Sequence, residues 1–259
     1  MKIDLRRFDC VASTQDICRE LAQSGAKEGV VIVAEGQTAG RGRTGTAWYS
    51  PLGQAIYASM LLRPRLAVPQ VSWITMIAAL AVSDAIHAMG VAETHIRRVS
   101  TPTIKWFNDI VLDAKKVCGI LVETAITDDR LDYAIFGIGL NVNTDFAEAP
   151  VEVRARATSL REAWGFSREL KLNRDAVLNT VLAQFVQRYE ALIDTQNSPA
   201  RAYAKRLDTL GKWVCVQSGD DIVEGLAHDI DDLGGLCIRT AQGERIAYFG
   251  HVLSAVSPQ

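Results

Sequence analysis

Residues 36–48 read Gly36-Gln37-Thr38-Ala39-Gly40-Arg41-Gly42-Arg43-Thr44-Gly45-Thr46-Ala47-Trp48, and the rest of the chain is organised around them. The flanking runs Val30–Ala34 and Ala55–Leu62 are short and apolar, which predicts two buried strands. Glycine lets the backbone approach a ligand closely, and arginine supplies a forked donor suited to phosphate or carboxylate. The stretch therefore predicts a mobile loop that folds over an anion; a solvated basic hairpin loop is the alternative on composition alone.

Two common nucleotide-binding motifs are excluded in this loop. Its glycine spacing fits the dinucleotide fingerprint, which also needs a helix after the third glycine and an acid about 20 residues further on. Thr46–Pro51 is no helix start, and Ser50–Val82 contains neither Asp nor Glu. The Rossmann match is therefore coincidental, and a Walker loop is excluded because no Gly-Lys-Ser/Thr follows.

The composition is that of a globular protein, with 259 residues, 48% of them hydrophobic and 22% charged. A net charge of -2 gives no support for bulk nucleic-acid binding, so we expect no DNA partner. Five scattered cysteines without a Cys-x-x-Cys pair argue against a disulfide framework or a zinc site and fit a reducing compartment. The N-terminus lacks a signal-peptide core, and the longest apolar stretch, near Ile74–Val82, is too short for a bilayer. These features predict a cytoplasmic protein without a membrane partner.

Periodicity predicts a strand over residues 3–11, an amphipathic helix from Ser13 through Leu21 and a long helix over Val68–Met89. A second long helix is expected over Asn173–Ile193 and a helical stretch over Pro199–Leu210. Ser13 or Thr14 can cap the first helix, and the alternative is that one hydroxyl is free to bind a ligand.

The middle of the chain predicts a hairpin, with strands over Ile104–Leu112 and Val117–Glu123. Strand alternation places Lys115 and Lys116 on opposite faces, so at most one of them enters a site. The next strand, Tyr133–Asn143, carries Gly137 and Gly139 on one face, which indicates close approach of a ligand or another backbone, and Asn141 continues that face. Thr144–Ala157 is expected to be an irregular loop.

From Lys212 the pattern changes to short strands, Trp213–Gln217, Ile222–His228, Gly235–Arg239 and Arg245–Phe249, separated by turns. This pattern predicts a small β-barrel and a boundary near Gly211. The expected domains are therefore a ligand-binding domain over residues 1–210 and a small β-domain over residues 211–259.

Several stretches occur in the order and spacing of one family, and the chain resembles a bacterial biotin protein ligase. The motifs are Ser13-Thr14-Gln15, the Gly36–Gly45 loop with Trp48, Lys105-Trp106-Phe107-Asn108-Asp109, Lys116-Val117-Cys118-Gly119-Ile120-Leu121 and Gly137-Ile138-Gly139-Leu140-Asn141. Bifunctional members carry an N-terminal helix-turn-helix before these motifs. The first strand here is expected from Ile3, so the resemblance is to the monofunctional type.

The resemblance implies an α+β fold of the class II synthetase-like, biotin–lipoate ligase-like kind, with a mixed sheet, helices and a small C-terminal SH3-like β-barrel. It implies an ATP-dependent ligase that converts biotin and Mg-ATP to biotinyl-5′-AMP and pyrophosphate. The biotinyl group then passes to one lysine of a biotin carboxyl carrier protein of acetyl-CoA carboxylase. Biotin and ATP are the substrates, Mg²⁺ is required and is not held by the protein alone, and the protein is a monomer or a homodimer.

Site residues follow from the resemblance by position. Biotin contacts are implied for Ser13, Thr14, Gln15, Gln37, Arg41, Gly42, Arg43, Lys116, Gly137 and Gly139. Nucleotide contacts are implied for Trp48, Asn108, Asp109, Lys116 and Asn141. Catalytic roles are implied for Arg41, Arg43 and Lys116, which stabilise charge developing on phosphorus.

Two positions depart from the family pattern. Phe107 stands where the family usually has proline, and Gly250–Ala255 lacks the arginine that many members carry near the C-terminus. A lipoate or octanoyl ligase shares the fold and the acyl-adenylate chemistry and is the nearest alternative. A non-catalytic biotin sensor is the alternative of another class.

Overall fold

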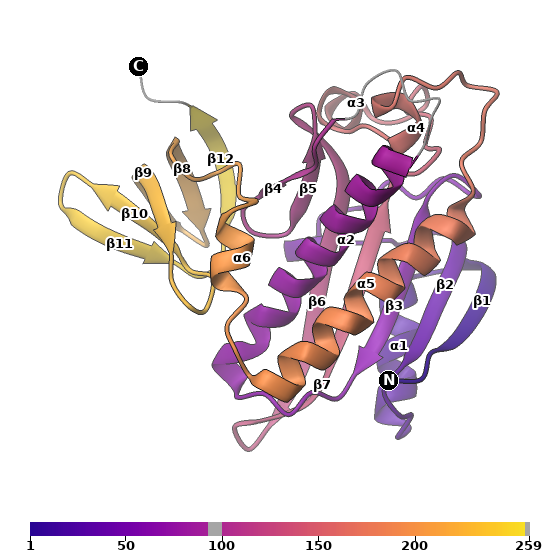
Figure 1. Ribbon diagram of the computed structural model, residues 1–259, viewed down its shortest axis with the longest axis horizontal. Helices are drawn as coiled ribbons and strands as arrows, with labels where there is room; N and C mark the ends of the chain where they lie inside the picture. Colours follow the sequence, from indigo (N-terminus) through magenta and orange to yellow (C-terminus); the bar gives the residue numbers. More distant parts are fainter. Residues whose placement is uncertain (93–99, 257–259) are drawn as a thin grey trace.

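The computed structural model describes residues 1–92 and 100–256, which form a seven-stranded mixed sheet with helices and a five-stranded C-terminal sheet (Figure 1). The large sheet contains β1 (Asp4–Val11), β2 (Val30–Gln37), β3 (Ile56–Leu62), β4 (Thr103–Lys105), β5 (Asp109–Leu112), β6 (Lys115–Thr127) and β7 (Arg130–Leu140). Its order is β1-β2-β3-β7-β6-β5-β4, in which β1 and β2 are parallel and the other pairs antiparallel. The α+β class predicted from the sequence is confirmed.

Two long helices cover one face of this sheet. Helix α2 (Ser72–Ala92) follows a short 3-10 turn, η2 (Val68–Val71), and lies beside α5 (Arg174–Thr195) across the strands (Figure 1). The Asn173 side chain caps α5 by accepting a hydrogen bond from the Ala176 amide. The segment Val68–Ala92 is apolar enough to span a membrane by composition, yet 72% of its most apolar window is buried within the protein. The apolar character of α2 is therefore that of a core helix.

Alternation along the strands gives the two faces of the sheet different contents. In β7, Phe136 faces the long helices and stacks on Phe185 with ring centroids 4.3 Å apart. Ile135 points to the other face, where α1 (Thr14–Gln23) covers a second, smaller apolar cluster. Gly137 and Gly139 continue that second face, as strand alternation predicts, and Gly137 faces Gln15 in the first turn of α1. The sheet thus has one face covered by the two long helices and one face that is only partly covered.

The predicted C-terminal β-domain is an antiparallel sheet of five strands paired in the order β11-β10-β9-β8-β12. Its strands are β8 (Trp213–Ser218), β9 (Asp221–Ile230), β10 (Leu236–Thr240), β11 (Gly243–Ala247) and β12 (His251–Val256). The sequence pattern predicts the first four strands, with β11 displaced by two residues, and misses β12. Strand β12 has only one buried residue, Val252, so its apolar alternation is weak.

Three local predictions are wrong. Ile104–Leu112 is not one strand but two, β4 and β5, separated by a turn at residues 106–108 that contains a cis Trp106–Phe107 peptide. The segment 144–157 contains a short helix, α3 (Val151–Arg156), and α4 (Leu160–Ala163) follows it. Of the helical stretch expected over Pro199–Leu210, only α6 (Ala200–Ala204) is an α-helix.

The C-terminal sheet is joined to the large one by specific contacts. Strand β4 lies next to residues 206–208, because the Ile104 amide donates to the Arg206 carbonyl and the Asp208 amide donates to the Ile104 carbonyl. The Trp106 indole donates to the Gly234 carbonyl over 3.0 Å. The β4–β5 hairpin is therefore held from both sides.

Candidate functional site

A cavity of about 970 Å³ lies on the partly covered face of the large sheet. Its wall includes the N-terminus of α1, the glycine loop, strands β3 to β7, helix α3 and the start of β12. Every residue to which the sequence analysis gave a site role lines this cavity. The structure therefore brings together segments that are more than 200 residues apart in the chain.

Glycines form the floor of the cavity. Gly137 pairs with Ser59 on β3 and with Leu121 on β6, and Gly139 pairs with Gly119 on β6. A Cβ atom on Gly139 would lie 2.6 Å from the Trp48 ring, and one on Gly119 would lie 2.8 Å from it. These positions are open to Trp48, and to a flat ligand group in its place, only because they lack side chains.

One end of the cavity is polar and uncharged. Ser13 is the N-cap residue of α1, but its hydroxyl makes no capping hydrogen bond. Of the two roles that the sequence allows for Ser13 and Thr14, capping the helix or binding a ligand, the second is therefore open to the Ser13 hydroxyl. Thr14 donates its amide to Gln37 Oε1 over 2.9 Å, and its hydroxyl lies 2.7 Å from that of Ser59. Gln15 Oε1 is buried with no hydrogen-bond partner in the described part of the chain. An unpaired buried acceptor is costly, and a ligand N–H would satisfy it.

The glycine loop is a short, internally bonded excursion between β2 and β3. The Gly42 amide donates to the Thr46 carbonyl and the Trp48 amide to the Gly40 carbonyl, with a 3-10 turn, η1 (Arg43–Gly45), at the tip. A Cβ atom on residue 40 would lie 2.7 Å from Ser50 Oγ, which explains why this position is a glycine. The backbone of the loop is thus held by hydrogen bonds within the loop itself.

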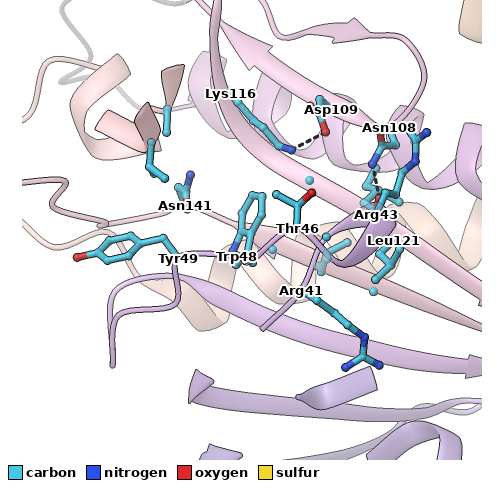
Figure 2. A pocket seen from close by; sticks show the side chains of 18 of the residues that line it. Arg41, Arg43, Thr46, Trp48, Tyr49, Asn108, Asp109, Lys116, Leu121 and Asn141 are labelled. Atoms are coloured by element: carbon cyan, nitrogen blue, oxygen red, sulfur yellow. Dashed lines mark hydrogen bonds and ion pairs between the residues drawn. The ribbon is translucent and has the colours of Figure 1, made fainter. Parts of the chain in front are cut away.

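Arg41 faces away from the charged end of the cavity (Figure 2). Its guanidinium donates to both carboxylate oxygens of Asp16, over 3.0 and 2.7 Å, and lies 3.5 Å from Glu123. Arg19 donates to the same two carboxylates. The hydrogen bond from Arg41 is the main reason that the pKa of Asp16 is lowered. The ion pairs attach the loop to α1 and β6.

Arg43 connects the loop to two other parts of the site. Its guanidinium donates to Asn108 Oδ1 over 2.9 Å and to the Gly250 carbonyl of the C-terminal domain over 2.7 Å. The same group lies over the Phe107 ring, 4.4 Å from its centroid, so the residue that replaces the family's proline packs against the loop. Burial lowers the pKa of Arg43 from its usual value.

Lys116 projects into the cavity, whereas Lys115 lies outside it, 3.9 Å from Glu162, as the alternation predicted. The Lys116 ammonium lies 2.7 Å from Asp109 Oδ1 and 5.0 Å from the centroid of the Trp48 ring (Figure 2). The indole N–H of Trp48 is buried without a hydrogen-bond partner among the described residues. A flat aromatic ring, an ammonium and a carboxylate therefore meet at the centre of the cavity.

Asn141 lies at the end of β7 and holds the segment that covers the cavity. Its amide donates to the Thr158 carbonyl over 3.1 Å, and its oxygen accepts from the Thr144 hydroxyl over 3.5 Å. Both ends of its side chain are thus used within the protein in this structure. Its nucleotide contact stays a prediction.

The sequence analysis missed several residues of the cavity wall. They include Ser59, Lys105, Gly119, Arg156 and His251. Gly119 could have been found because it belongs to the same run as Lys116, but its pairing with Gly139 is a matter of strand register. His251 and Arg156 reach the site through tertiary packing alone, which no spacing in the sequence indicates.

The described residues contain no cluster of three or more His, Cys, Asp or Glu side chains placed to hold a metal ion. Asp109 and Glu152 are the carboxylates that line the cavity within the described part of the chain.

Comparisons with known proteins identify the family of this chain. The Biotin/lipoate A/B protein ligase family matches residues 7–141, and the Biotin protein ligase C terminal domain matches residues 209–253. The bifunctional ligase/repressor BirA of Bacillus spizizenii is 35% identical over 93% of this chain and 70% of its own. The biotin–[acetyl-CoA-carboxylase] ligase of Mycobacterium tuberculosis is 34% identical over 90% of this chain and 83% of its own.

A solved structure agrees with these sequence relatives. The biotin protein ligase of Aquifex aeolicus in complex with biotin and ATP superposes with a TM-score of 0.78 at 29% identity, covering 95% of this chain and 96% of its own. The chain belongs to the biotin protein ligases, within the biotin/lipoate protein ligase family.

Proposed function

We propose that the chain activates biotin with ATP to form biotinyl-5′-AMP and then transfers the biotinyl group to one lysine of a biotin carboxyl carrier protein. The observation that carries this proposal is the division of the cavity into an uncharged end and a cationic end. Ser13, Thr14 and the unpaired Gln15 oxygen form the first end, and Lys116 is at the second. A relative with this activity is named for acetyl-CoA carboxylase, so the carrier of that enzyme is the expected acceptor.

The uncharged end fits the ureido ring of biotin. That ring presents two N–H donors and one carbonyl acceptor and carries no charge, so it suits hydroxyl and amide side chains. Gln15 Oε1 can accept from a ureido N–H, and the Ser13 hydroxyl can donate to the ureido carbonyl. Gly137 leaves room for the ring, because a Cβ there would lie 3.0 Å from the Gln15 side chain.

The first step needs no protein nucleophile. A carboxylate oxygen of biotin attacks the α-phosphorus of ATP, the bond to the oxygen bridging the α- and β-phosphates breaks, and pyrophosphate leaves with that electron pair. The protein must bring two anions together and stabilise charge at phosphorus, which Lys116 and Arg43 are placed to do. Arg43 would exchange its Asn108 and Gly250 acceptors for substrate oxygens, and Arg41 would bind through its backbone while Asp16 holds its side chain.

Mg²⁺ enters with the nucleotide, as Mg-ATP, and would neutralise charge on the phosphates. Asp109, which pairs with Lys116 over 2.7 Å, would orient the hydrated ion when Lys116 turns to the substrate oxygens. Trp48, placed over Gly139 and Gly119, is the ring against which adenine would stack, with Asn141 beside it.

The second step is acyl transfer. The carrier lysine, as a neutral amine, attacks the acyl carbon of biotinyl-5′-AMP, the bond from that carbon to the phosphate oxygen breaks, and AMP leaves. The amine gives up a proton to solvent, and an amide bond results. The glycine loop and the residues 250–253 beside it would keep water from the reactive anhydride until the carrier arrives.

Biotin-dependent exchange of radiolabelled pyrophosphate into ATP tests this proposal. The expected result is exchange that requires biotin and ignores lipoate and octanoate, followed by labelling of a carrier domain. Exchange supported by lipoate or octanoate would select the alternative ligase. Biotin binding with no exchange at all would select a biotin sensor.

A further inference from the structure

The two places at which the chain departs from the family pattern meet at the tip of the glycine loop. Phe107 lies under the Arg43 guanidinium, 4.4 Å from it at the ring centroid. In the C-terminal segment that lacks the family's arginine, the Gly250 carbonyl accepts a hydrogen bond from Arg43 over 2.7 Å. The next residue, His251, places its Nε2 atom 3.1 Å from the Thr44 hydroxyl. Both departures therefore contact the tip of the loop, which points to a role in holding it.

The hydrogen bond between Thr44 and His251 has a defined direction. A hydroxyl group has one proton to donate, and Thr44 donates it to the Arg43 carbonyl over 2.7 Å. The imidazole must therefore donate its Nε2–H to the Thr44 oxygen. The neutral Nε2–H tautomer and the imidazolium can both do this, and so can a side-chain amide of similar reach.

The backbone at both ends of this hydrogen bond is constrained. Thr44 has φ 53° and ψ 28°, a left-handed conformation that β-branched residues rarely adopt. Such a conformation persists where the surrounding contacts hold it, and the hydrogen bond from His251 is one of them. On the other side, Gly250 has φ 137°, and a Cβ atom there would lie 2.4 Å from the Gln217 carbonyl. Glycine at position 250 thus lets the chain place His251 at the start of β12.

The two residues of the loop tip should respond differently to substrate. In the proposed reaction, the Arg43 guanidinium leaves Asn108 and the Gly250 carbonyl for substrate oxygens. The hydrogen bond from His251 to Thr44 involves neither the guanidinium nor those two acceptors, so it can persist while Arg43 binds substrate. The loop then stays attached to the C-terminal domain at the stage when the reactive adenylate must be kept in the cavity.

We propose that His251 is a positioning residue that holds the tip of the glycine loop closed over the cavity and so retains biotinyl-5′-AMP until the carrier arrives. This inference rests on the proposed function and names the side chain by which the C-terminal domain acts on the loop. His251 acts through Thr44 and not on the reacting atoms. The escape of the adenylate should therefore depend on His251 more than the formation of the adenylate does.

Protonation of His251 should weaken this closure. Burial and the positive charge of Arg43 lower the pKa of His251 below its usual 6.5, with Lys116 and Lys105 acting in the same direction and Asp109 opposing them. When the loop opens, Arg43 moves away and the pKa of His251 rises towards 6.5. As the pH falls below 6.5, the open state therefore takes up a proton before the closed state does, which favours opening. Closure is complete above that pH and weakens below it.

Release of radiolabelled biotinyl-5′-AMP tests the role directly. The full chain is loaded with the chemically synthesised adenylate and chased with an excess of unlabelled adenylate. At about pH 7.5, His251→Ala and Thr44→Val should each release the label about 3- to 10-fold faster than wild type, the usual effect of losing one hydrogen bond. The double variant should release it no faster than the faster single variant, because both changes remove the same hydrogen bond. Single-turnover formation of the adenylate should change by a smaller factor than its release.

His251→Gln gives a readout that a merely structural role would not move. Its amide can donate to Thr44 but does not titrate, so release should be close to the wild-type rate at about pH 7.5 and constant down to about pH 5.5. Wild type should release the adenylate faster as the pH falls through that range. The matched control is His228→Ala, which removes a histidine of β9 that lies 2.8 Å from Glu244. This variant should keep both the wild-type rate and its pH dependence.

The outcomes separate this inference from the proposed function. Wild-type release from His251→Ala and Thr44→Val would overturn the positioning role, as would additive effects in the double variant or an unchanged pH dependence in His251→Gln. Each of these results would leave the proposed function standing. A wild-type chain that neither binds biotinyl-5′-AMP nor shows biotin-dependent pyrophosphate exchange would overturn the proposed function, and the positioning role with it.

Discussion

The two faces of the seven-stranded sheet are built from the same strands, but one face packs against helices and the other forms a cavity. On one face, Phe136 and Ile138 of β7 belong to the large apolar core under α2 and α5, where Phe136 stacks on Phe185. On the other, the residues between and after them, Gly137 and Gly139, leave a floor for a cavity of about 970 Å³. The volume of alternate side chains therefore decides which face packs against the helices and stabilises the fold, and which face leaves room for a ligand.

The largest effect on stability is expected on the packed face. Phe136→Ala should lower the free energy of unfolding by about 3–5 kcal/mol, because Phe136 is buried and stacks on Phe185. Denaturant titration measures the loss, and KM for biotin measured well below the unfolding midpoint should not change. A large change in KM with little loss of stability would show that the two faces are not independent.

The next effect is on catalysis and belongs to the cavity face. Lys116→Ala should slow adenylate formation by about 10²–10³-fold, the usual result of removing one group that stabilises developing charge. Biotin affinity should fall much less, because that charge grows only in the transition state. Single-turnover formation of biotinyl-5′-AMP measures the first quantity and calorimetry the second. Normal turnover in Lys116→Ala with none in Lys115→Ala would mean that the wrong lysine of the pair was chosen.

Filling the floor of the cavity should have the opposite result to Phe136→Ala: catalysis should be impaired and stability should be nearly unchanged. Gly139→Val places a side chain where a Cβ already lies 2.6 Å from the Trp48 ring, so Trp48 must shift. The proposed stacking of adenine on Trp48 predicts a loss of about 100-fold in kcat/KM for ATP when the ring is displaced. Thermal unfolding should change little, because β-branched residues suit strands. A strongly destabilised Gly139→Val with normal kcat/KM would show that Gly139 is needed for folding alone.

The smallest effect is expected at the rim, where Asp16 holds Arg41. Asp16→Asn should cost less than about 1 kcal/mol of stability, because the pair is partly exposed to solvent. The Arg41 hydrogen bond lowers the pKa of Asp16 below its usual 3.8, so its contribution is complete above that value and is lost as pH falls through the lower one. Denaturant titrations of wild type and Asp16→Asn should therefore differ at pH 6 and converge at strongly acid pH. A constant difference across that range would contradict the ion-pair role.

Much of the fold follows from local patterns. The strands β1, β2, β3 and β7 and the helices α2 and α5 occupy the segments that periodicity predicts, because each has one apolar stripe or a continuous apolar run. Errors fall where a few residues must turn. Residues 106–108 interrupt an otherwise apolar strand pattern, and their geometry is fixed from outside, by the Thr209 hydroxyl and by packing against Arg43. The domain boundary near Gly211 and the residue roles stay predictions.

The sequence by itself determined most of the strands, the long helices, the glycine loop and the family, because these depend on residue order and spacing. Only the tertiary structure decided which charges remain available in the cavity. Arg41 and Arg43 belong to one motif, yet one pairs with Asp16 and the other reaches Asn108 and the Gly250 carbonyl. Arg156 lies in a segment to which sequence reasoning gave no role, yet it lines the same cavity as the glycine loop. The physical reason is that ion pairing depends on distances between elements, and those distances are set when the sheet and its covering segments pack together.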